Sequence, residues 1–160
     1  MITLNDRFGL FSAPAARRLA LRQLAVLVLL PGLPVYAQGP SALQLTAPEA
    51  LAQSQAGKLT LIDIRTPGEW QDTGVPKGAL RINLQHPGGA AGFASEVLKS
   101  VKGNPAAAIA LICRTGNRSS VAQKVLQAHG LSRVYNVPEG MAGSSAGPGW
   151  LQRGLPLQQP

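Results

Sequence analysis

The feature that most constrains the fold is the apolar run "AAAIALIC" at residues 106–113, in which polar and apolar side chains do not alternate. A strand of this kind has both faces covered, as happens at the centre of a parallel sheet with helices on each side. Neighbouring parallel strands also need crossover connections, which are usually helical. The run therefore predicts an α/β fold in which this strand lies inside the sheet.

Strands and helices alternate along the chain from residue 46 onward. Further strands are predicted at residues 59–64, 79–84 and 133–137, and helices at 46–57, 93–103 and 119–130. The first helix begins with a capping box formed by Thr46 and Glu49. The segment at 65–78 is expected to be a loop with about one helical turn, and 86–92 a flexible joint. This order predicts a central parallel sheet with helices on both faces.

The N-terminal residues have the pattern of an export signal. A basic region with Arg17, Arg18 and Arg22 precedes a short apolar stretch at 24–30, and "VYA" stands before Gln38. The stretch is shorter than the roughly 20 apolar residues that cross a bilayer. We expect residues 1–37 to be a cleaved signal peptide, with an uncleaved anchor as the alternative. The mature protein would be exported to a bacterial periplasm and have no membrane segment.

The expected cleavage after Ala37 sets where the remaining segments begin. Residues 38–45 are expected to be a linker, 46–156 a single α/β domain, and 157–160 a short C-terminal tail. A mature chain that starts at Gln38 is long enough to bury a core of its own.

The charge of the chain does not indicate a nucleic-acid partner. The formal net charge is +8, but four of the 15 Lys and Arg residues lie within the first 22 positions. The remaining basic residues are scattered and few aromatic residues accompany them, so no nucleic-acid surface is expected. His86, His129 and the single cysteine are far apart in sequence, and we expect neither a metal site nor a cofactor.

The single cysteine, Cys113, is the strongest candidate for a functional residue. A chain with one cysteine cannot form an internal disulfide, which is the usual use of cysteine in an oxidising compartment. Cys113 ends the central strand, and binding crevices of parallel sheets lie at the carboxyl ends of strands. Arg114, Arg118 and a helix N-terminus near Ser119 would all lower its pKa. We interpret Cys113 as a nucleophile, with a buried inert cysteine as the alternative.

The loop "CRTGNRS" at 113–119 is built to hold an anionic group next to sulfur. Gly116 allows a positive φ, Ser119 is expected to cap the following helix, and main-chain N–H groups in such a turn form an anion-binding concavity. Cysteine phosphatases place an arginine at Cys-x5-Arg, whereas Arg118 stands at Cys-x4-Arg. The shorter loop favours a smaller species such as a persulfide sulfur, and a phosphatase or arsenate reductase is the less favoured alternative.

Four blocks of sequence resemble a single-domain rhodanese. They read "LIDIRTPGEW", "GVPKGALRINL", "CRTGNRSSVAQKVLQAHG" and "VYNVPEGMAG", in the order and spacing of that family, and the resemblance runs from about Thr46 to Pro156. It implies a rhodanese-like fold with a parallel sheet of about five strands and helices on both faces. It differs in two places: "TGVPKGA" lacks the histidine of the family's Gly-His-Ile-Pro segment, and Glu139 replaces the first glycine of a Gly-Gly pair.

The resemblance also implies a mechanism. Cys113 would take the outer sulfur of a small anionic donor such as thiosulfate, and its persulfide would pass that sulfur to a thiol, to cyanide or to a protein acceptor. The loop's main-chain N–H groups would cradle the transferred sulfur. These come from Arg114, Thr115, Gly116, Asn117, Arg118 and Ser119. The side chain of Arg118 would orient the sulfonate, and that of Arg114 would lower the cysteine pKa. The alternative is a persulfide carrier or sensor for a periplasmic protein, with little turnover of small molecules.

Two charged residues outside the loop, Asp63 and Arg65, are expected to support the site. Asp63 and Arg65 end the strand before the cysteine strand, and we expect a salt bridge that anchors the loop, with Glu69 as a further partner. The alternative is that Asp63 or Arg65 shapes the electrostatics of the Cys113 pocket. Glu139 either repels anionic sulfur donors or points away from them.

Overall fold

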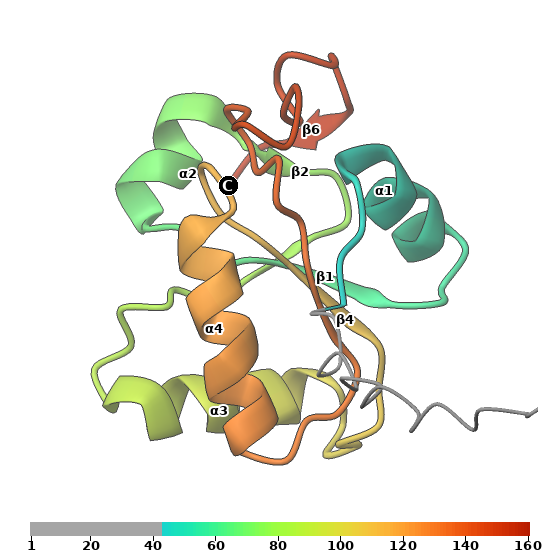
Figure 1. The fold of residues 1–160 in the computed structure, drawn as a ribbon. Coiled ribbons are helices and arrows are strands. Elements are labelled where there is room, and N and C mark those ends of the chain that lie inside the picture. The colour runs from blue at the N-terminus through green and yellow to red at the C-terminus, as the bar shows by residue number, and fades with distance from the viewer. Residues whose placement is uncertain (1–42) are drawn as a thin grey trace, which may run out of the picture. The chain divides into compact units, whose positions relative to one another are not determined.

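The computed structural model describes residues 43–160, so the predicted signal peptide and residues 38–42 of the linker lie outside the described residues. The elements appear in Figure 1, and their bounds are α1 Ala47–Gln55, β1 Thr60–Asp63, α2 Pro67–Thr73, β2 Val75–Pro76, β3 Leu80–Arg81, α3 Gly89–Ser100, β4 Ile109–Ile112, α4 Asn117–Ala128, β5 Val134–Asn136 and β6 Leu157–Gln158. Within the described residues, no helix is long and apolar enough to cross a membrane.

The main sheet is parallel, as the apolar run predicts. Its strand order is β3-β1-β4-β5, so β4 is an inner strand that pairs with β1 on one side and β5 on the other. Four strands form this sheet rather than about five. Beyond β5 a single parallel bridge joins Gln44 to Asn136, supported by main-chain bonds to Leu43 and Leu45. Part of the expected linker therefore occupies the position of a fifth strand.

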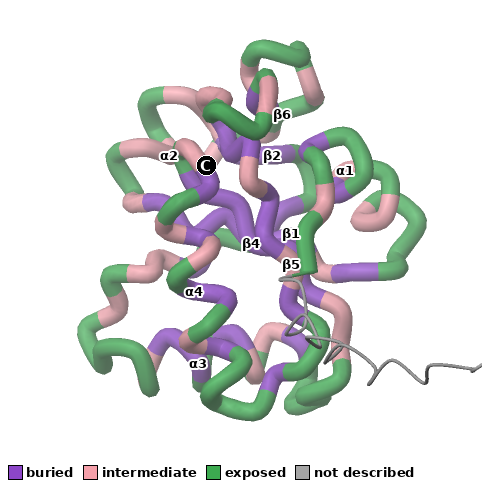
Figure 2. Tube along the Cα trace, in the orientation of Figure 1, coloured by how far each residue is buried: buried purple, intermediate pink, exposed green. Residues whose placement is uncertain are grey.

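Helices and loops cover both faces of the sheet. Side chains of successive strand residues point to opposite faces, so Ile62 and Leu111 pack against α3 and α4 through residues such as Phe93. On the other face Ala110 and Ile112 pack against α1 and the segment after β5. Figure 2 shows β4 and most of β1 buried between these coverings, whereas both residues of the edge strand β3 are exposed. The expected α/β architecture with helices on both faces is confirmed.

Several boundaries differ from the sequence-based expectation for local reasons. The loop expected at 65–78 contains α2, because Thr66 and Glu69 form a second capping box with both reciprocal bonds. The expected joint at 86–92 supplies the first turn of α3, which begins at Gly89. The strand expected at 79–84 is only the two residues of β3.

The C-terminal residues belong to a second, smaller sheet. Leu157 and Gln158 form β6, which pairs antiparallel with Val75 and Pro76 of β2. The Gln158 side chain also accepts a hydrogen bond from the main-chain N–H of Gly78 at 2.8 Å. The segment expected to be a tail therefore packs on the domain.

Replacing a core residue of β4 should destabilise the whole domain. Leu111 is fully buried in the central strand, so Leu111→Ala should lower the free energy of unfolding by about 2 to 5 kcal/mol. Val121 on α4 is 60% exposed, and Val121→Ala should change that energy by less than about 0.5 kcal/mol. Urea denaturation of both variants measures the difference, and equal losses would contradict this assignment of the core.

Candidate active site

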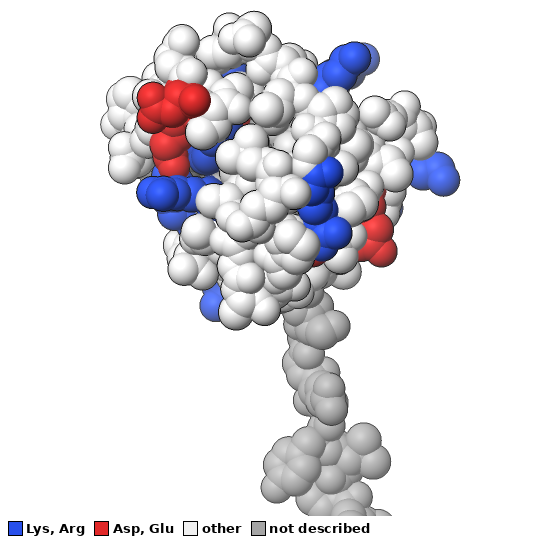
Figure 3. Space-filling model, turned by 90° about the horizontal axis from the view of Figure 1, so that it is seen from above, with Lys and Arg blue, Asp and Glu red and all other residues white. Residues whose placement is uncertain are grey.

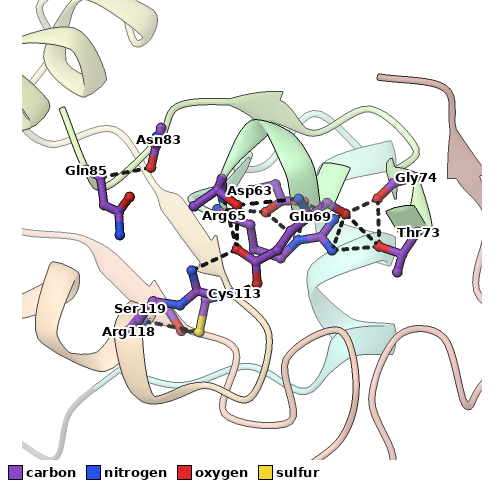
Figure 4. Close-up of polar contacts among 11 residues, drawn as sticks. Asp63, Arg65, Glu69, Thr73, Gly74, Asn83, Gln85, Cys113, Arg118 and Ser119 are labelled. Carbon is purple, nitrogen blue, oxygen red and sulfur yellow. Dashed lines mark hydrogen bonds and ion pairs between the residues drawn. The ribbon is translucent and has the colours of Figure 1, made fainter. Parts of the chain in front are cut away.

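Cys113 lies at the carboxyl end of β4, where the chain turns into α4. The side chain is almost fully buried, with 1% of its surface exposed. Its Sγ accepts hydrogen bonds from the main-chain N–H of Ser119 at 3.4 Å and from the Ser119 hydroxyl at 3.3 Å (Figure 4). The site therefore places one sulfur atom against the first turn of a helix.

Ser119 differs from its expected role as the helix cap. Helix α4 begins at Asn117, and Gly116 occupies the cap position with a φ of +83° and no side-chain cap. Ser119 is the third helical residue, and its hydroxyl lies within hydrogen-bonding distance of both the Gly116 carbonyl, at 3.0 Å, and Cys113 Sγ. The prediction of a Ser119 cap is wrong, because the helix starts two residues earlier and turns this side chain toward sulfur.

Some main-chain groups of the loop form hydrogen bonds that support it, and others have no partner in the part of the chain that the structure describes. The carbonyls of Cys113 and Arg114 accept hydrogen bonds from the N–H groups of Met141 and Ala142 at 2.9 and 2.8 Å. Within residues 43–160, the N–H groups of positions 114 to 118 donate to no protein acceptor. Only the Ser119 N–H contacts Cys113 Sγ in this structure. The other N–H groups of the expected cradle have no acceptor among the described residues.

Two glycines allow the loop to lie against the segment after β5. A Cβ atom at Gly116 would stand 2.1 Å from the carbonyl oxygen of Pro138, and one at Gly140 would stand 2.5 Å from the Arg114 carbonyl oxygen. Both glycines also have positive φ values. The contact between the two segments is therefore made by main-chain atoms, and neither position accepts a side chain without displacement.

Arg118 points toward α2 rather than standing alone at the loop. Its Nη1 and Nη2 donate to the two carboxylate oxygens of Glu69 at 2.9 and 2.5 Å (Figure 4). The bond from Arg118 is the main reason why the pKa of Glu69 falls to about 2. The sequence had offered Glu69 only as a partner of Arg65, and the 49 residues between it and Arg118 gave no signal of this pair.

Asp63 and Arg65 form the expected salt bridge. Arg65 Nη2 lies 2.7 Å from Asp63 Oδ2, and both side chains are buried. Arg65 also donates to the Glu69 carbonyl at 3.2 Å, to Thr73 Oγ1 at 2.7 Å and to the Gly74 carbonyl at 2.6 Å. Arg65 contacts the main chain of Glu69 and not its carboxylate. These bonds fix both ends of α2 to the end of β1, and so hold Glu69 beside Arg118.

A cavity of about 340 Å³ opens next to the loop. It is lined by Arg65, Glu69, Asp72, Thr73, Arg114, Met141, Ala142 and Leu151. Arg114 and Asp72 are exposed, and neither forms an ion pair among the described residues. Figure 3, which looks at the molecule from above, shows separate acidic and basic groups on that face instead of one continuous basic patch.

Glu139 points away from the sulfur. The side chain is 3% exposed, and its carboxylate accepts hydrogen bonds from the Ala47 N–H at 2.6 Å and from Arg153 Nη2 at 2.7 Å. Ala47 is the first residue of α1, so this carboxylate also meets the positive end of a helix dipole. Of the two roles considered for Glu139, the structure therefore shows the one in which it does not repel sulfur donors.

The remaining candidates lie apart from Cys113. His86 contacts Glu96 at 3.4 Å, and His129 Nδ1 contacts the Val125 carbonyl at 2.8 Å near the end of α4. Among residues 43–160, no group of three or more His, Cys, Asp or Glu side chains is arranged to hold a metal ion.

Comparison with known proteins identifies the family. The model of the rhodanese-like domain matches residues 46–146. The chain belongs to the rhodanese-like family. An uncharacterized protein of Rickettsia prowazekii is 30% identical to it over 103 residues, which are 61% of this chain and 81% of the relative. A second uncharacterized protein, from Rickettsia conorii, is 31% identical over 107 residues, with the same coverage of 61% and 81%.

Solved structures agree with this assignment. The polysulfide-sulfur transferase homodimer of Wolinella succinogenes has 26% identity and a TM-score of 0.54, and the alignment covers 74% of this chain and 80% of that one. The Rv0390 protein of M. tuberculosis also has 26% identity, with a TM-score of 0.58 and coverage of 74% and 98%. The rhodanese-like domain and its sulfurtransferase neighbours together support a role in sulfur transfer.

The pH dependence of stability should report the Glu69–Arg118 pair. The pKa of Glu69 is about 2 in the folded protein, against an ordinary value of 4.5. Its stabilising contribution is therefore complete above pH 4.5 and is lost as the pH falls toward 2. Urea denaturation between about pH 5 and about pH 2.5 should show a shallower loss in Glu69→Gln. Glu96→Gln, which removes a 48% exposed carboxylate, should keep the steep loss, and parallel curves for all three proteins would contradict the prediction.

The two glycines at the ends of α4 should differ in their tolerance of alanine. Gly116 and Gly130 both have positive φ, but a Cβ at Gly130 meets no atom within 4 Å. Gly130→Ala should therefore cost only the backbone strain of about 1 kcal/mol. Gly116→Ala must also displace Pro138, and should cost roughly 3 kcal/mol or more. Thermal or urea unfolding compares them, and equal costs would show that the loop does not depend on its contact with Pro138.

Proposed function

We propose that this protein is a sulfurtransferase that moves sulfane sulfur from a donor such as thiosulfate to a thiol or cyanide through a Cys113 persulfide. The observation that supports this most is the position of Cys113 Sγ, at the end of β4 and against the N–H and hydroxyl of Ser119. These hydrogen bonds hold the sulfur at the start of α4. The loop N–H groups that have no acceptor among the described residues support binding of the added sulfur.

The first half of the reaction loads the sulfur. The Cys113 thiolate attacks the outer sulfur of thiosulfate, a new S–S bond forms at Sγ, and the S–S bond of thiosulfate breaks. Sulfite leaves with the electron pair of that bond, so Cys113 carries a persulfide anion. The loop then stabilises the terminal sulfur, which bears the charge, through main-chain N–H groups.

The second half unloads the sulfur. Cyanide or an acceptor thiolate attacks the terminal sulfur, and the electron pair of the persulfide bond returns to Cys113 Sγ. The products are thiocyanate or an acceptor persulfide, together with the original thiolate. No cofactor takes part, because covalent catalysis by the cysteine divides the transfer into two substitutions.

A second candidate function is a persulfide carrier that serves a protein partner. It is favoured by the pairing of Arg118 with Glu69, which removes an obvious binding group for small anions. A carrier would load readily, discharge slowly to cyanide and discharge rapidly to a protein thiol. We further propose that the chain acts after export, which depends on the signal pattern in residues 1–37.

The mass of the intact protein tests the persulfide directly. After incubation with thiosulfate the protein should gain one sulfur atom, and cyanide should remove it with release of thiocyanate. Cys113→Ser is the matched control and should gain nothing, because a hydroxyl forms no persulfide. A wild-type protein that gains no sulfur, or a Cys113→Ser variant that gains one, would contradict the proposed function.

A further inference from the structure

Glu69 binds the guanidinium of Arg118, one of the two arginines of the active loop. Both carboxylate oxygens of Glu69 accept hydrogen bonds from Arg118, one from each terminal nitrogen of the guanidinium. The two side chains are only 25% and 36% exposed. Such a bidentate pair is the geometry in which a guanidinium also binds a sulfonate or phosphate. A sulfur donor that uses the same edge of Arg118 must therefore displace Glu69.

Glu69 is held in place by more than Arg118. Its Oε2 also accepts hydrogen bonds from the Thr66 N–H at 3.0 Å and the Thr66 hydroxyl at 3.1 Å, which close the capping box of α2. Its main-chain carbonyl accepts from Arg65 Nη1 at 3.2 Å. Moving the carboxylate away from Arg118 would open the cap of α2. The pair is therefore a fixed part of the site and not a mobile surface contact.

The other charges near the loop do not replace the cation that Glu69 neutralises. Arg65 is paired with the buried Asp63, and the exposed Arg114 shares its cavity with the exposed Asp72. The hydrogen bond to Glu69 is the main reason why the pKa of Arg118 is raised, and Cys113 and Asp63 contribute less. Arg65 and Arg118 are thus paired with carboxylates, whereas Arg114 forms no ion pair among the described residues and has Asp72 in the same cavity. The approach to Cys113 carries little excess positive charge for a doubly negative substrate.

We propose that Glu69 is a specificity-determining residue that, by occupying Arg118, makes the site favour singly charged sulfur donors over doubly charged ones. The proposal rests on the proposed sulfur transfer by Cys113 and identifies the charge class of its substrate. Thiosulfate, with two negative charges, would react slowly because the guanidinium of Arg118 is already bound to Glu69. A donor with one negative charge needs less positive charge to neutralise it, so its reaction rate is lowered less when Arg118 is bound to Glu69.

Two sulfur donors of matched chemistry test the proposal. Thiosulfate carries two negative charges and methanethiosulfonate carries one, and both deliver their outer sulfur to a thiolate by breaking an S–S bond. Glu69→Gln removes the charge that holds Arg118, while glutamine still fits the capping box. The ratio of kcat/KM for thiosulfate to that for methanethiosulfonate should rise roughly tenfold in this variant. Most of the change should be a lower KM for thiosulfate, because ground-state binding of the sulfonate improves.

Asp72→Asn is the matched control. It removes one carboxylate from the same cavity, but Asp72 does not contact Arg118. The donor ratio should stay within about twofold of the wild type, since an exposed charge is screened by solvent. The ratio compares two donors on one preparation, so a partly unfolded variant does not change it. An unchanged ratio in Glu69→Gln, or an equal rise in Asp72→Asn, would overturn the proposal.

A double variant shows whether Glu69 acts through Arg118. In an Arg118→Ala background there is no guanidinium to release, so adding Glu69→Gln should leave the donor ratio unchanged. The coupling energy between Glu69 and Arg118, measured on the donor ratio, then nearly equals the whole effect of Glu69→Gln. The same roughly tenfold rise in the Arg118→Ala background would overturn the proposal, because it would assign the effect to net charge alone.

Alkylation of Cys113 separates this proposal from the proposed function. Iodoacetate is an anion and iodoacetamide is neutral, and neither requires sulfur transfer. Glu69→Gln should raise the rate ratio of iodoacetate to iodoacetamide several-fold, and Asp72→Asn should not. If wild-type Cys113 takes no sulfur from either donor, the proposed function fails, while this ratio still tests Glu69. An unchanged ratio, or a Cys113 that neither reagent reaches, would overturn the proposal for Glu69.

Discussion

The geometry of the site depends on the buried guanidinium of Arg65. Burying a charge is costly unless it is paired and its hydrogen bonds are satisfied. Arg65 meets both conditions, since it binds Asp63 at the end of β1 and three acceptors at the beginning and end of α2. The short helix is therefore attached to the sheet at a defined angle. Because Glu69 is part of that helix, the same attachment decides where its carboxylate meets Arg118.

The loop around Cys113 is held from two further directions. The segment from Pro138 to Ala142 packs against the loop through main-chain hydrogen bonds and the close contacts of two glycines. The first turn of α4 follows the loop, and there the N–H and hydroxyl of Ser119 contact the sulfur. Strand β4 fixes the position of Cys113 itself, because its neighbours β1 and β5 pair with it along its length. Three separate parts of the chain thus converge on one atom.

Much of this arrangement could be predicted from the sequence. The unbroken apolar run at 106–113 indicated a buried parallel strand, and the position of Cys113 at its end followed from that strand. The positive φ of Gly116 and the Asp63–Arg65 salt bridge were also expected, and both are present. These features are local, because they depend on residues that are close together in the sequence.

The features that could not be predicted join distant residues or depend on one helical turn. The contact between Glu69 and Arg118 spans 49 positions, and two-residue strands such as β2 and β6 leave no periodicity to recognise. Helix α2 had a readable capping box at Thr66, but a seven-residue helix is too short to show an amphipathic pattern. Ser119 was misplaced because a helix start is uncertain by one or two residues. For Ser119 this shift of two residues matters, because its side chain contacts the sulfur instead of capping the helix.

The main-chain nature of the loop's support has a consequence for protein engineering. Within the described part of the chain, the side chains of Arg114, Thr115 and Asn117 form no hydrogen bond, so no side-chain hydrogen bond from these three positions holds the loop's shape. Gly116 and Ser119 do take part and leave little freedom. A library that varies the first three positions while keeping the last two would redesign what approaches the sulfur without redesigning the scaffold.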